Sequence, residues 1–396
     1  MIRFFSTFIF ILLLFFSLLY ISEYKYFLTG ISKFYFKGHT TAFLNDYQSF
    51  DNRLIKTSKN IQPWIKHSMY NKFQFDSELE NYHSKTKTVA FLIIKNDSLL
   101  YEKYYEGYDR NTKSNSFSMS KSIVSALMGI AIQEGFIKSL DQRVVDFLPE
   151  LKGSYANLLT VGDLSSMASG LKWDESYYSP FSITTRSYVD EDLNKLILNQ
   201  PIDSKPGESF RYLSGATQLL AMVIQIATGK KISNYLSEKF WQPMGAENDA
   251  LWQIDSKSAD MEKAYCCLAS TARDFARFGK LYKDFGKWNQ VQLLDSIFVS
   301  KSLKPRFNDS PHYGYGWWLR NYNGYNTFMM RGHLGQYVIV VPEEDLIIVR
   351  LGHRKDRKIE DEDFTKDIFV YLDAGIEINE SQAIKKNHGA GSGISL

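Results

Sequence analysis

The sequence predicts an α+β fold: an antiparallel sheet built from N- and C-terminal segments and flanked by helices, with an inserted, mainly helical lobe. Strand patterns occur at residues 88–104 and again at 326–351, whereas residues 140–300 mostly show helical spacing interrupted by Gly, Pro, Ser and Asp. Strands at both ends with helices between them favour a single sheet made from both termini. An uncharged N-terminal segment adds a transmembrane helix to this plan.

The N-terminal segment from residue 4 to residue 22 carries no charged side chain. Its 19 residues cover about 28 Å as a helix, which is enough for the hydrocarbon core of a bilayer. A cleaved signal peptide would have a shorter apolar region and a small-x-small site, which residues 18–22 do not offer. We therefore predict a transmembrane signal anchor at residues 4–22. The single Arg3 places the N-terminus in the cytoplasm, so the rest of the chain is expected to be extracytoplasmic, in the periplasm or at the cell surface.

The remaining elements follow in chain order. Residues 23–84 are polar and aromatic with weak patterning, so we expect a stalk and an N-terminal extension there, with a helix or two near residues 77–83. The globular domain is expected at 85–375, with its helical lobe at about 140–300. Its predicted elements are strands 88–94 and 98–104, helices 118–134, 214–228, 271–282 and 362–372, and strands 326–331, 337–341 and 346–351. Residues 376–396 end in NHGAGSGISL and are expected to form a flexible tail.

The composition excludes several classes of protein. With 396 residues, 44% hydrophobic and 23% charged, the chain is globular rather than disordered and is long enough for two lobes. The net charge is only +3 and no long basic run occurs, so nucleic acid is not an expected partner. The adjacent Cys266 and Cys267 cannot link distant segments and are expected to be two small buried side chains. The histidines lack metal-ligand spacing and no phosphate loop occurs, so we expect neither a metal nor a cofactor.

The strongest chemical signal is Ser118-Met119-Ser120-Lys121 at the start of a predicted helix. Residues three apart share a helix face, so the Ser118 hydroxyl and the Lys121 amine can meet. A serine hydroxyl needs a partner to remove its proton, and a lysine can help if burial depresses its pKa. The helix N-terminus also leaves backbone N–H groups free, and that of Ser118 can face a developing oxyanion. Taken alone, the four residues are more often a helix cap followed by a solvated lysine.

Four further segments extend this signal in a fixed order. With the run at 117–141, they are 159–170, 205–214 (KPGESFRYLS), 267–278 and 331–336 (RGHLGQ). Together they resemble the serine β-lactamase and penicillin-binding protein superfamily, most of all its branch with AmpC-type β-lactamases, serine D,D-carboxypeptidases, EstB-like esterases and 6-aminohexanoate-dimer hydrolases. The resemblance covers about 85–375 and implies a β-lactamase/transpeptidase-like fold and a hydrolase that acts through an acyl-enzyme on Ser118.

The resemblance gives Tyr212, in the second motif, a catalytic role. A phenol near a lysinium is pushed toward phenolate, so Tyr212 could take the Ser118 proton and return it to the leaving group. By itself, a tyrosine before a helix more often packs in the core with its hydroxyl at the surface. Ser214 stands where the family often has Asn, and it is expected to hydrogen-bond Lys121.

The resemblance also assigns roles in the third motif. The backbone N–H of Gln336 is the implied second oxyanion donor, and Gly335 lets the strand approach the substrate. His333 stands where relatives carry Lys or His, and it is expected to supply a positive field near Tyr212 or Lys121; the alternative is a strand histidine bonded to backbone.

Three residues are expected to contact the substrate. Leu334 replaces a hydroxyl that relatives use to bind a carboxylate, which favours an ester or amide lacking that group. Arg331 falls on the opposite sheet face by strand alternation, so it is not expected to compensate. Trp173 and Tyr177 lie in a loop that the family uses as one edge of the pocket; simple loop packing is the alternative for both.

Two functions follow from this reading. The first is a membrane-anchored serine hydrolase that acts on a small molecule or short peptide, namely an ester or amide, with a D-amino-acid peptide or a β-lactam among the candidates. The second is a catalytically silent fold of the same kind that binds cell-wall peptide or a partner protein. The intact set of Ser118, Lys121 and Tyr212 favours the first, because a binding protein does not need all three.

Overall fold

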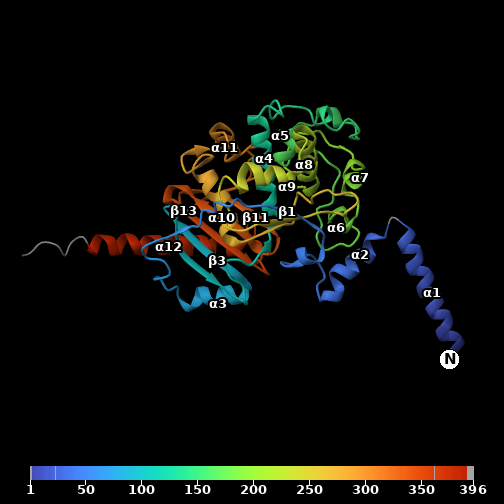
Figure 1. Ribbon diagram of the computed structural model, residues 1–396, viewed down its shortest axis with the longest axis horizontal. Coiled ribbons are helices and arrows are strands. Elements are labelled where there is room, and N and C mark those ends of the chain that lie inside the picture. The colour runs from blue at the N-terminus through green and yellow to red at the C-terminus, as the bar shows by residue number, and fades with distance from the viewer. Residues whose placement is uncertain (1, 23, 361, 390–396) are drawn as a thin grey trace, which may run out of the picture.

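A seven-stranded sheet built from both ends of the chain lies at the centre of the molecule (Figure 1). The computed structural model describes residues 2–22, 24–360 and 362–389. Across the sheet, the strands are β10 (Trp318–Tyr322), β11 (Tyr325–Gly332), β12 (Gln336–Val341), β13 (Leu346–Gly352), β3 (Thr88–Lys95), β4 (Ser98–Tyr104) and β2 (Ile65–Lys66). Neighbours run antiparallel, except that β2 pairs with β4 in parallel. This confirms the predicted sheet from both termini.

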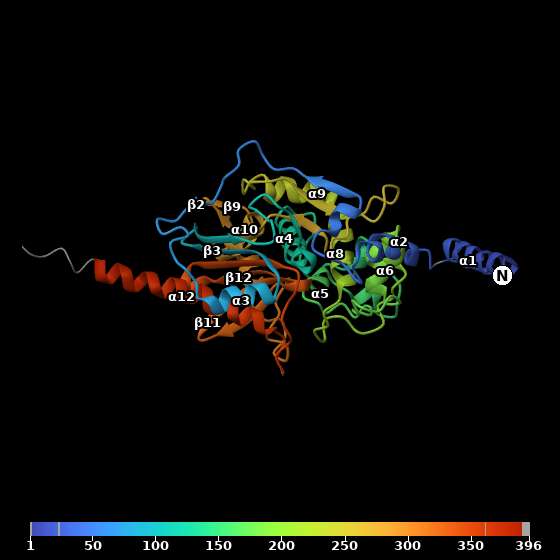
Figure 2. The ribbon, with the colours of Figure 1, turned by 90° about the horizontal axis from the view of Figure 1, so that it is seen from below.

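Both faces of this sheet are covered, which explains why its central strands are apolar throughout. Along β12, Val338 and Val340 belong to one core, where α10 (Ala272–Lys283) packs, whereas Ile339 belongs to a second core with α12 (Lys366–Gly389) and α3 (Ser77–Lys85). The alternation follows from the two-residue period of a strand. Figure 2 shows α10 on one side of the sheet and α3 and α12 on the other.

The helical lobe lies beside the sheet, as predicted. Its longest helix is α8 (Ser214–Thr228), which packs against α4 (Ser120–Gln133). The turn Phe117–Met119, directly before α4, contacts β11 and β12 of the sheet. The shorter helices of this lobe and its surroundings are α5 (Val161–Ser165), α6 (Ile183–Val189), α7 (Leu193–Leu198), α9 (Ile232–Leu236) and α11 (Ser296–Ser302). A second sheet, β1 (Asn52–Ile55), β6 (Ala250–Gln253), β7 (Leu268–Ser270) and β5 (Ser114–Asn115), was not foreseen.

Short elements complete the chain. They are the hairpin β8 (Lys287–Trp288) and β9 (Val291–Gln292), the 3-10 turns η1 (Tyr35–Lys37), η2 (Asp46–Ser49), η3 (Phe117–Met119), η4 (Val144–Asp146), η5 (Ala156–Leu158), η7 (His333–Gly335) and η8 (Pro342–Glu344), and the π-helical turn η6 (Ser237–Trp241).

The N-terminal extension is folded onto the body rather than forming a free stalk. Its helix α2 (Tyr26–Lys33) packs against α6, and β1 pairs with β6 along Asn52–Ile55. The Phe34 ring lies 5.8 Å from that of Tyr188 in the lobe. The weak pattern of residues 23–84 therefore reflects irregular structure held by aromatic contacts with the lobe.

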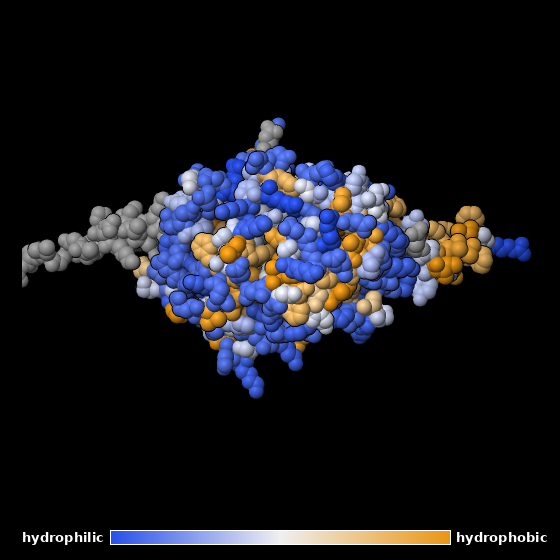
Figure 3. All heavy atoms as spheres, turned by 90° about the horizontal axis from the view of Figure 1, so that it is seen from above, coloured by the Kyte–Doolittle hydropathy of each residue, from blue (hydrophilic) through white to orange (hydrophobic). Residues whose placement is uncertain are grey.

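Two helices project from opposite ends of the body (Figure 1). The N-terminal α1 (Ile2–Ile21) is long and apolar enough to cross a membrane, and Figure 3 shows its apolar side chains standing outside a largely hydrophilic body. At the other end, α12 continues to Gly389, so residues 376–389 are helical where a flexible tail was expected. Residues 390–396 of that expected tail lie outside the described residues.

Candidate active site

Ser118 lies in the turn η3, between strand β5 and helix α4. The backbone is held here: the Phe117 N–H donates to Asn115 Oδ1 at 2.9 Å, and Phe117 has a left-handed φ of 45°. A non-glycine residue in that region is uncommon and needs support from its surroundings. Ser118 itself stays partly exposed while its neighbours Phe117 and Met119 are buried. The turn therefore presents the hydroxyl to a cavity.

Lys121, one turn further along α4, points its amine at this hydroxyl. Its Nζ lies 3.0 Å from Ser118 Oγ and 2.8 Å from the backbone oxygen of Tyr265. The residue is 3% exposed, and this burial lowers the pKa of the Lys121 amine to about 8, against the attraction of Glu175, which raises it. An amine in this range is partly neutral near neutral pH, so Lys121 has the property that a general base needs.

Tyr212 meets the same pair from the segment before α8. The Lys121 Nζ lies 5.1 Å from the centre of the Tyr212 ring, and Tyr212 and Ser118 line the same cavity. Burial raises the pKa of Tyr212 above its ordinary value, although the nearby Ser118 hydroxyl and the charge of Arg331 oppose that shift. The expectation that a lysinium drives this phenol toward phenolate is therefore not met. Tyr212 is therefore a protonated phenol that can donate, and Lys121 is the group of this pair whose lowered pKa makes it partly neutral.

Glu175 is a site residue for which the sequence suggested no catalytic role. Its carboxylate accepts from the Ser214 hydroxyl at 2.5 Å, from the Ser214 N–H at 2.7 Å and from the Tyr177 hydroxyl at 2.6 Å. Ser214 thus bonds Glu175, not Lys121 as expected. The signal was present in the sequence, since Glu175 belongs to the loop expected to edge the pocket, but nothing local indicates that its charge acts on Lys121.

Arg331 reaches the same site, contrary to expectation. Strand alternation does place it on the α12 face, where its guanidinium lies 4.2 Å from the Trp318 ring centre and donates to the Asp363 backbone oxygen at 3.0 Å. Because β11 ends one residue later, the side chain also lines a cavity that contains Ser118 and Tyr212. Its Nη1 is buried with no hydrogen-bond partner among the described residues.

His333 does not supply the expected positive field. Burial lowers the pKa of its imidazole to about 4, so the ring is neutral at neutral pH. The ring stacks on Tyr177 at 5.4 Å and meets the edge of Phe117 at 5.6 Å. The positive charge that acts on Tyr212 comes from Arg331, two residues earlier.

The side chains in the rest of the third motif have partners away from Ser118. Gln336 is fully buried, and its side-chain amide bonds the backbone of Gly352 at 2.7 and 3.0 Å. Gly335 has a φ of 87°, and a Cβ there would stand 2.3 Å from the Arg350 guanidinium, so the glycine makes room for arginine and not for substrate. Neither residue, nor Leu334, lines a cavity that contains Ser118. The substrate contact expected at Leu334 is therefore not found.

The two aromatic residues of the pocket-edge loop behave differently. Trp173 is buried, and its indole donates to Thr184 Oγ1 at 2.8 Å, so it packs in the core. Tyr177 lines both cavities at the site. Of the two expected substrate contacts, the structure brings only Tyr177 to Ser118.

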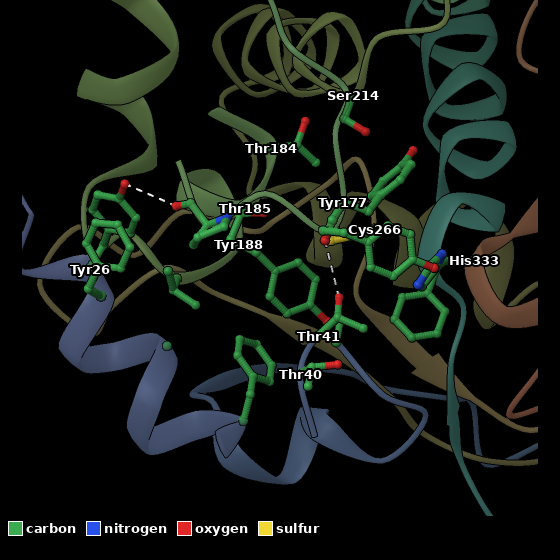
Figure 4. A pocket seen from close by; sticks show the side chains of 18 of the residues that line it. Tyr26, Thr40, Thr41, Tyr177, Thr184, Thr185, Tyr188, Ser214, Cys266 and His333 are labelled. Atoms are coloured by element: carbon green, nitrogen blue, oxygen red, sulfur yellow. Dashed lines mark hydrogen bonds between the residues drawn. The ribbon is translucent and has the colours of Figure 1, made fainter. Parts of the chain in front are cut away.

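Two cavities meet at Ser118. The large cavity, of about 450 Å³, lies between α2, the loop at residues 40–42 and the segment 177–189 (Figure 4). The small cavity, of about 130 Å³, lies on the other side and is lined by Tyr212, Arg331 and Lys355. Tyr177 and His333 border both. The nucleophile therefore has room for one group on each side of a scissile bond.

Cys266 and Cys267 are buried as expected, but they form a disulfide between adjacent residues, which was not expected. Cys266 lines the large cavity, next to the Tyr265 carbonyl that accepts from Lys121.

Comparison with known proteins agrees with these features. The family model described as Beta-lactamase matches residues 75–371. The 6-aminohexanoate-dimer hydrolase of Paenarthrobacter ureafaciens is 26% identical over 302 residues, which cover 70% of this chain and 76% of that protein. Protein flp of Staphylococcus aureus (strain COL) is 27% identical over 193 residues, 46% of this chain and 38% of flp. The chain thus matches little more than a third of flp.

A solved structure from Bacillus anthracis, provisionally described as a 6-aminohexanoate-dimer hydrolase, superposes with a TM-score of 0.71 at 21% identity and covers 92% of this chain and 96% of its own. This protein therefore belongs to the beta-lactamase family and has its serine-hydrolase type of fold, as the ordered motifs indicated.

Proposed function

We propose that this member of the beta-lactamase family is a membrane-anchored serine hydrolase that cleaves an ester or amide through an acyl-enzyme on Ser118. The observation that carries the proposal is the 3.0 Å contact between Ser118 Oγ and Lys121 Nζ, in a site where burial lowers the pKa of that amine to about 8. A hydroxyl beside a partly neutral amine is an activated nucleophile.

Acylation starts with the neutral Lys121 amine. It takes the Ser118 proton as Oγ bonds to the substrate carbonyl carbon, whose oxygen becomes an oxyanion. As the bond to the leaving group breaks, Tyr212 donates its phenolic proton to the departing nitrogen or oxygen, and Lys121 returns a proton to the phenol. Water then attacks the Ser118 ester and gives its proton to Lys121, and the acid departs as Ser118 regains a proton.

The oxyanion needs two N–H donors. The first is the N–H of Ser118 at the start of α4. For the second we propose the backbone N–H of Gln336, the first residue of β12, whose side-chain bonds to the Gly352 backbone fix the chain at this point.

The substrate proposed here is a small molecule or short peptide with an ester or amide bond. Arg331, with its unpartnered Nη1, offers a donor to the leaving group in the small cavity. The relative in Paenarthrobacter acts on a 6-aminohexanoate dimer, which is an amide, and this supports amides among the candidates. D-amino-acid amides and β-lactams are the other candidate substrates to be assayed.

The anchoring part of the proposal rests on α1. Its span Arg3–Ile21 is 19 mostly apolar residues, none of them buried, and the surface of the body that follows is largely hydrophilic (Figure 3). We propose that α1 stays in the membrane and that the active site faces the periplasm or the cell surface. Cleavage of an added N-terminal tag from either side of sealed vesicles tests that orientation.

Labelling with a fluorophosphonate tests the catalytic proposal. The full chain in phosphatidylcholine vesicles is expected to gain one adduct on the peptide that contains Ser118. Ser118→Ala should lose the adduct, and Ser120→Ala, a neighbouring serine that bonds the Ala264 backbone at 2.9 Å, should keep it. Labelling of Ser118→Ala would rule out Ser118 as the nucleophile. A folded wild type that neither labels nor hydrolyses p-nitrophenyl esters, nitrocefin or D-amino-acid amides would favour the silent binding protein.

A further inference from the structure

The large cavity beside Ser118 is built partly by the N-terminal extension. One wall comes from α2 and the residues after it, including Tyr26, Gly30 and Phe34, and the opposite wall comes from the segment 177–189 of the lobe. Figure 4 shows α2 running along the cavity, with side chains of both segments turned into it. A part of the chain that looked like a stalk thus lies next to the nucleophile.

Among the residues that the structure describes, the lining of this cavity carries no Lys, Arg, Asp or Glu side chain. Its one titratable imidazole, His333, is neutral because burial lowers its pKa to about 4. Several lining hydroxyls already have partners in the protein. Tyr26 donates to the Pro180 backbone at 3.2 Å, Thr184 to the Asp174 backbone at 2.6 Å, and Tyr188 to Asp46 at 2.6 Å. Such a lining suits an apolar occupant, because buried polar groups need partners.

The position of Tyr212 says which half of the substrate lies here. The donor to the leaving group must stand near the departing atom, and Tyr212 lines the small cavity but not the large one. The leaving group therefore goes to the small cavity, beside Arg331 and Lys355. The large cavity is left for the acyl group.

We propose that the large cavity binds a linear apolar acyl chain, so that the substrate is an ester or amide of a medium-chain fatty acid. This inference rests on the hydrolase proposed above and names its substrate class. A volume of about 450 Å³ holds roughly 15 groups of the size of water at about 30 Å³ each. A chain of about eight to twelve carbons fits that space.

The N-terminal extension, which contributes this wall, is linked to the turn that carries Ser118 through Asp46 at the start of η2. Asp46, fully buried, accepts from Asn115 Nδ2 at 2.9 Å and from the Tyr188 hydroxyl. Asn115 Oδ1 in turn accepts from the Phe117 N–H beside Ser118. One buried network thus joins the extension, the lobe and the nucleophile turn. Since α2 directly follows the apolar α1, the acyl cavity lies on the part of the body closest to a membrane that α1 would cross.

A chain-length series tests the inference in the full chain, reconstituted in phosphatidylcholine vesicles. The substrates are p-nitrophenyl esters whose acyl groups have two to sixteen carbons. We expect kcat/KM to rise by up to about fourfold for each added methylene, and by at least about tenfold over the series. Beyond about twelve acyl carbons, kcat/KM should fall. Equal kcat/KM for acetyl and decanoyl esters would overturn the inference and leave the hydrolase standing, since Ser118 would still turn over.

Gly30→Phe places a ring in the cavity, because a Cβ on Gly30 meets no atom within 4 Å. We expect it to lower the ratio of decanoyl to acetyl kcat/KM at least about tenfold, by taking the space of several methylenes. Ala42→Leu narrows the cavity from another segment and should act in the same direction. Ser32→Phe, an exposed position on the same helix, is the matched control and should leave the ratio unchanged. An unchanged ratio in folded Gly30→Phe and Ala42→Leu contradicts the inference.

Binding to Ser118→Ala separates the cavity from the chemistry. Dodecanoate, measured by displacement of a fluorescent fatty acid, is expected to bind this variant, and the further change Gly30→Phe should weaken binding at least about tenfold. If dodecanoate binds Ser118→Ala but the wild type has no esterase activity, only the hydrolase proposal is contradicted. If dodecanoate does not bind, the inference about the acyl chain is contradicted. Two further measurements identify the compound that carries the acyl chain. Release of fatty acid from the vesicle phosphatidylcholine indicates a membrane lipid. Hydrolysis of the added esters alone indicates a soluble acyl compound.

Discussion

The two cavities that meet at Ser118 differ in size and in charge. In the described part of the chain, the large one, of about 450 Å³, has no carboxylate, amine or guanidinium in its lining, whereas the small one, of about 130 Å³, has Arg331 and Lys355 beside the Tyr212 phenol. A single hydroxyl thus stands at the boundary between an apolar and a cationic environment. This difference in polarity agrees with the proposed placement of the acyl group in the large cavity and the leaving group beside Tyr212 in the small one.

Lys121, the proposed base, acts on a substrate whichever groups occupy the two cavities. Its removal therefore has the largest expected effect. Lys121→Met should lower kcat/KM about 100- to 10,000-fold for every acyl and leaving group. In the wild type, kcat/KM should rise with pH and level off above about 8, because the Lys121 amine is a base only after it loses its proton, and its pKa is about 8. Stopped assays with p-nitrophenyl acetate and with a D-amino-acid amide measure both effects. Lys205→Met, at an exposed lysine paired with Glu208, is the control, and an equal loss there would contradict this assignment.

Tyr212→Phe isolates the small cavity. The ring stays and the donor is lost, so kcat/KM should fall about 100-fold for an amide, whose nitrogen must be protonated as it leaves. For a p-nitrophenyl ester the loss should stay within about tenfold, since nitrophenolate leaves without a proton. Tyr265→Phe, which removes a hydroxyl on the side of the large cavity, should keep the ratio of amide to ester rates. A Tyr212→Phe enzyme with an unchanged ratio would rule out the phenol as donor.

Arg331→Met tests the charge of the small cavity. Hydrogen bonds to charged groups contribute about 1.5–3 kcal/mol, so substrates with an anionic leaving group should lose about tenfold or more in kcat/KM relative to neutral ones. The variant should also raise the pKa of Tyr212 further, because Arg331 opposes the effect of burial on that phenol. The measurement is a pair of esters that differ only by a carboxylate on the leaving group. Equal losses for both esters would mean that Arg331 does not contact the leaving group.

Glu175→Gln should change the pH dependence more than the rate. The carboxylate raises the pKa of Lys121 against the effect of burial, so its loss should lower that pKa and move the acid limb of the pH profile to lower pH. The side-chain oxygen of glutamine can still accept hydrogen bonds from Ser214 and Tyr177, so the variant is expected to fold. A profile that stays in place or moves to higher pH would show that the charge of Glu175 does not reach the amine.

His333→Phe is expected to have the smallest effect. The imidazole is already neutral and acts by stacking on Tyr177, and phenylalanine retains a stacking ring. The change in kcat/KM should remain within about tenfold, the size of an aromatic pair, and the acid limb of the pH profile should not move. Movement of that limb would restore His333 as a charged participant.

Local patterns in the sequence predicted much of this protein. The hairpin of β3 and β4, the helix α8 and the pairing of Ser118 with Lys121 depend on periodicity, turn residues and an i,i+3 spacing, all of which are properties of neighbouring residues. The resemblance of five ordered segments added Tyr212, which the structure brings to the same pair. The sequence therefore determined the sheet from both termini, the inserted lobe and the three side chains that meet at Ser118.

Only the tertiary structure decided what surrounds these three groups. Glu175 acts on Lys121 from a loop, Arg331 arrives because β11 ends one residue after it, and Gln336 is drawn into the core by its bonds to Gly352. The extension becomes a wall of the large cavity through aromatic contacts and the buried Asp46. Burial and long-range contacts set these charges and positions, and neither is encoded in the spacing of adjacent residues, because both depend on which distant segments pack together.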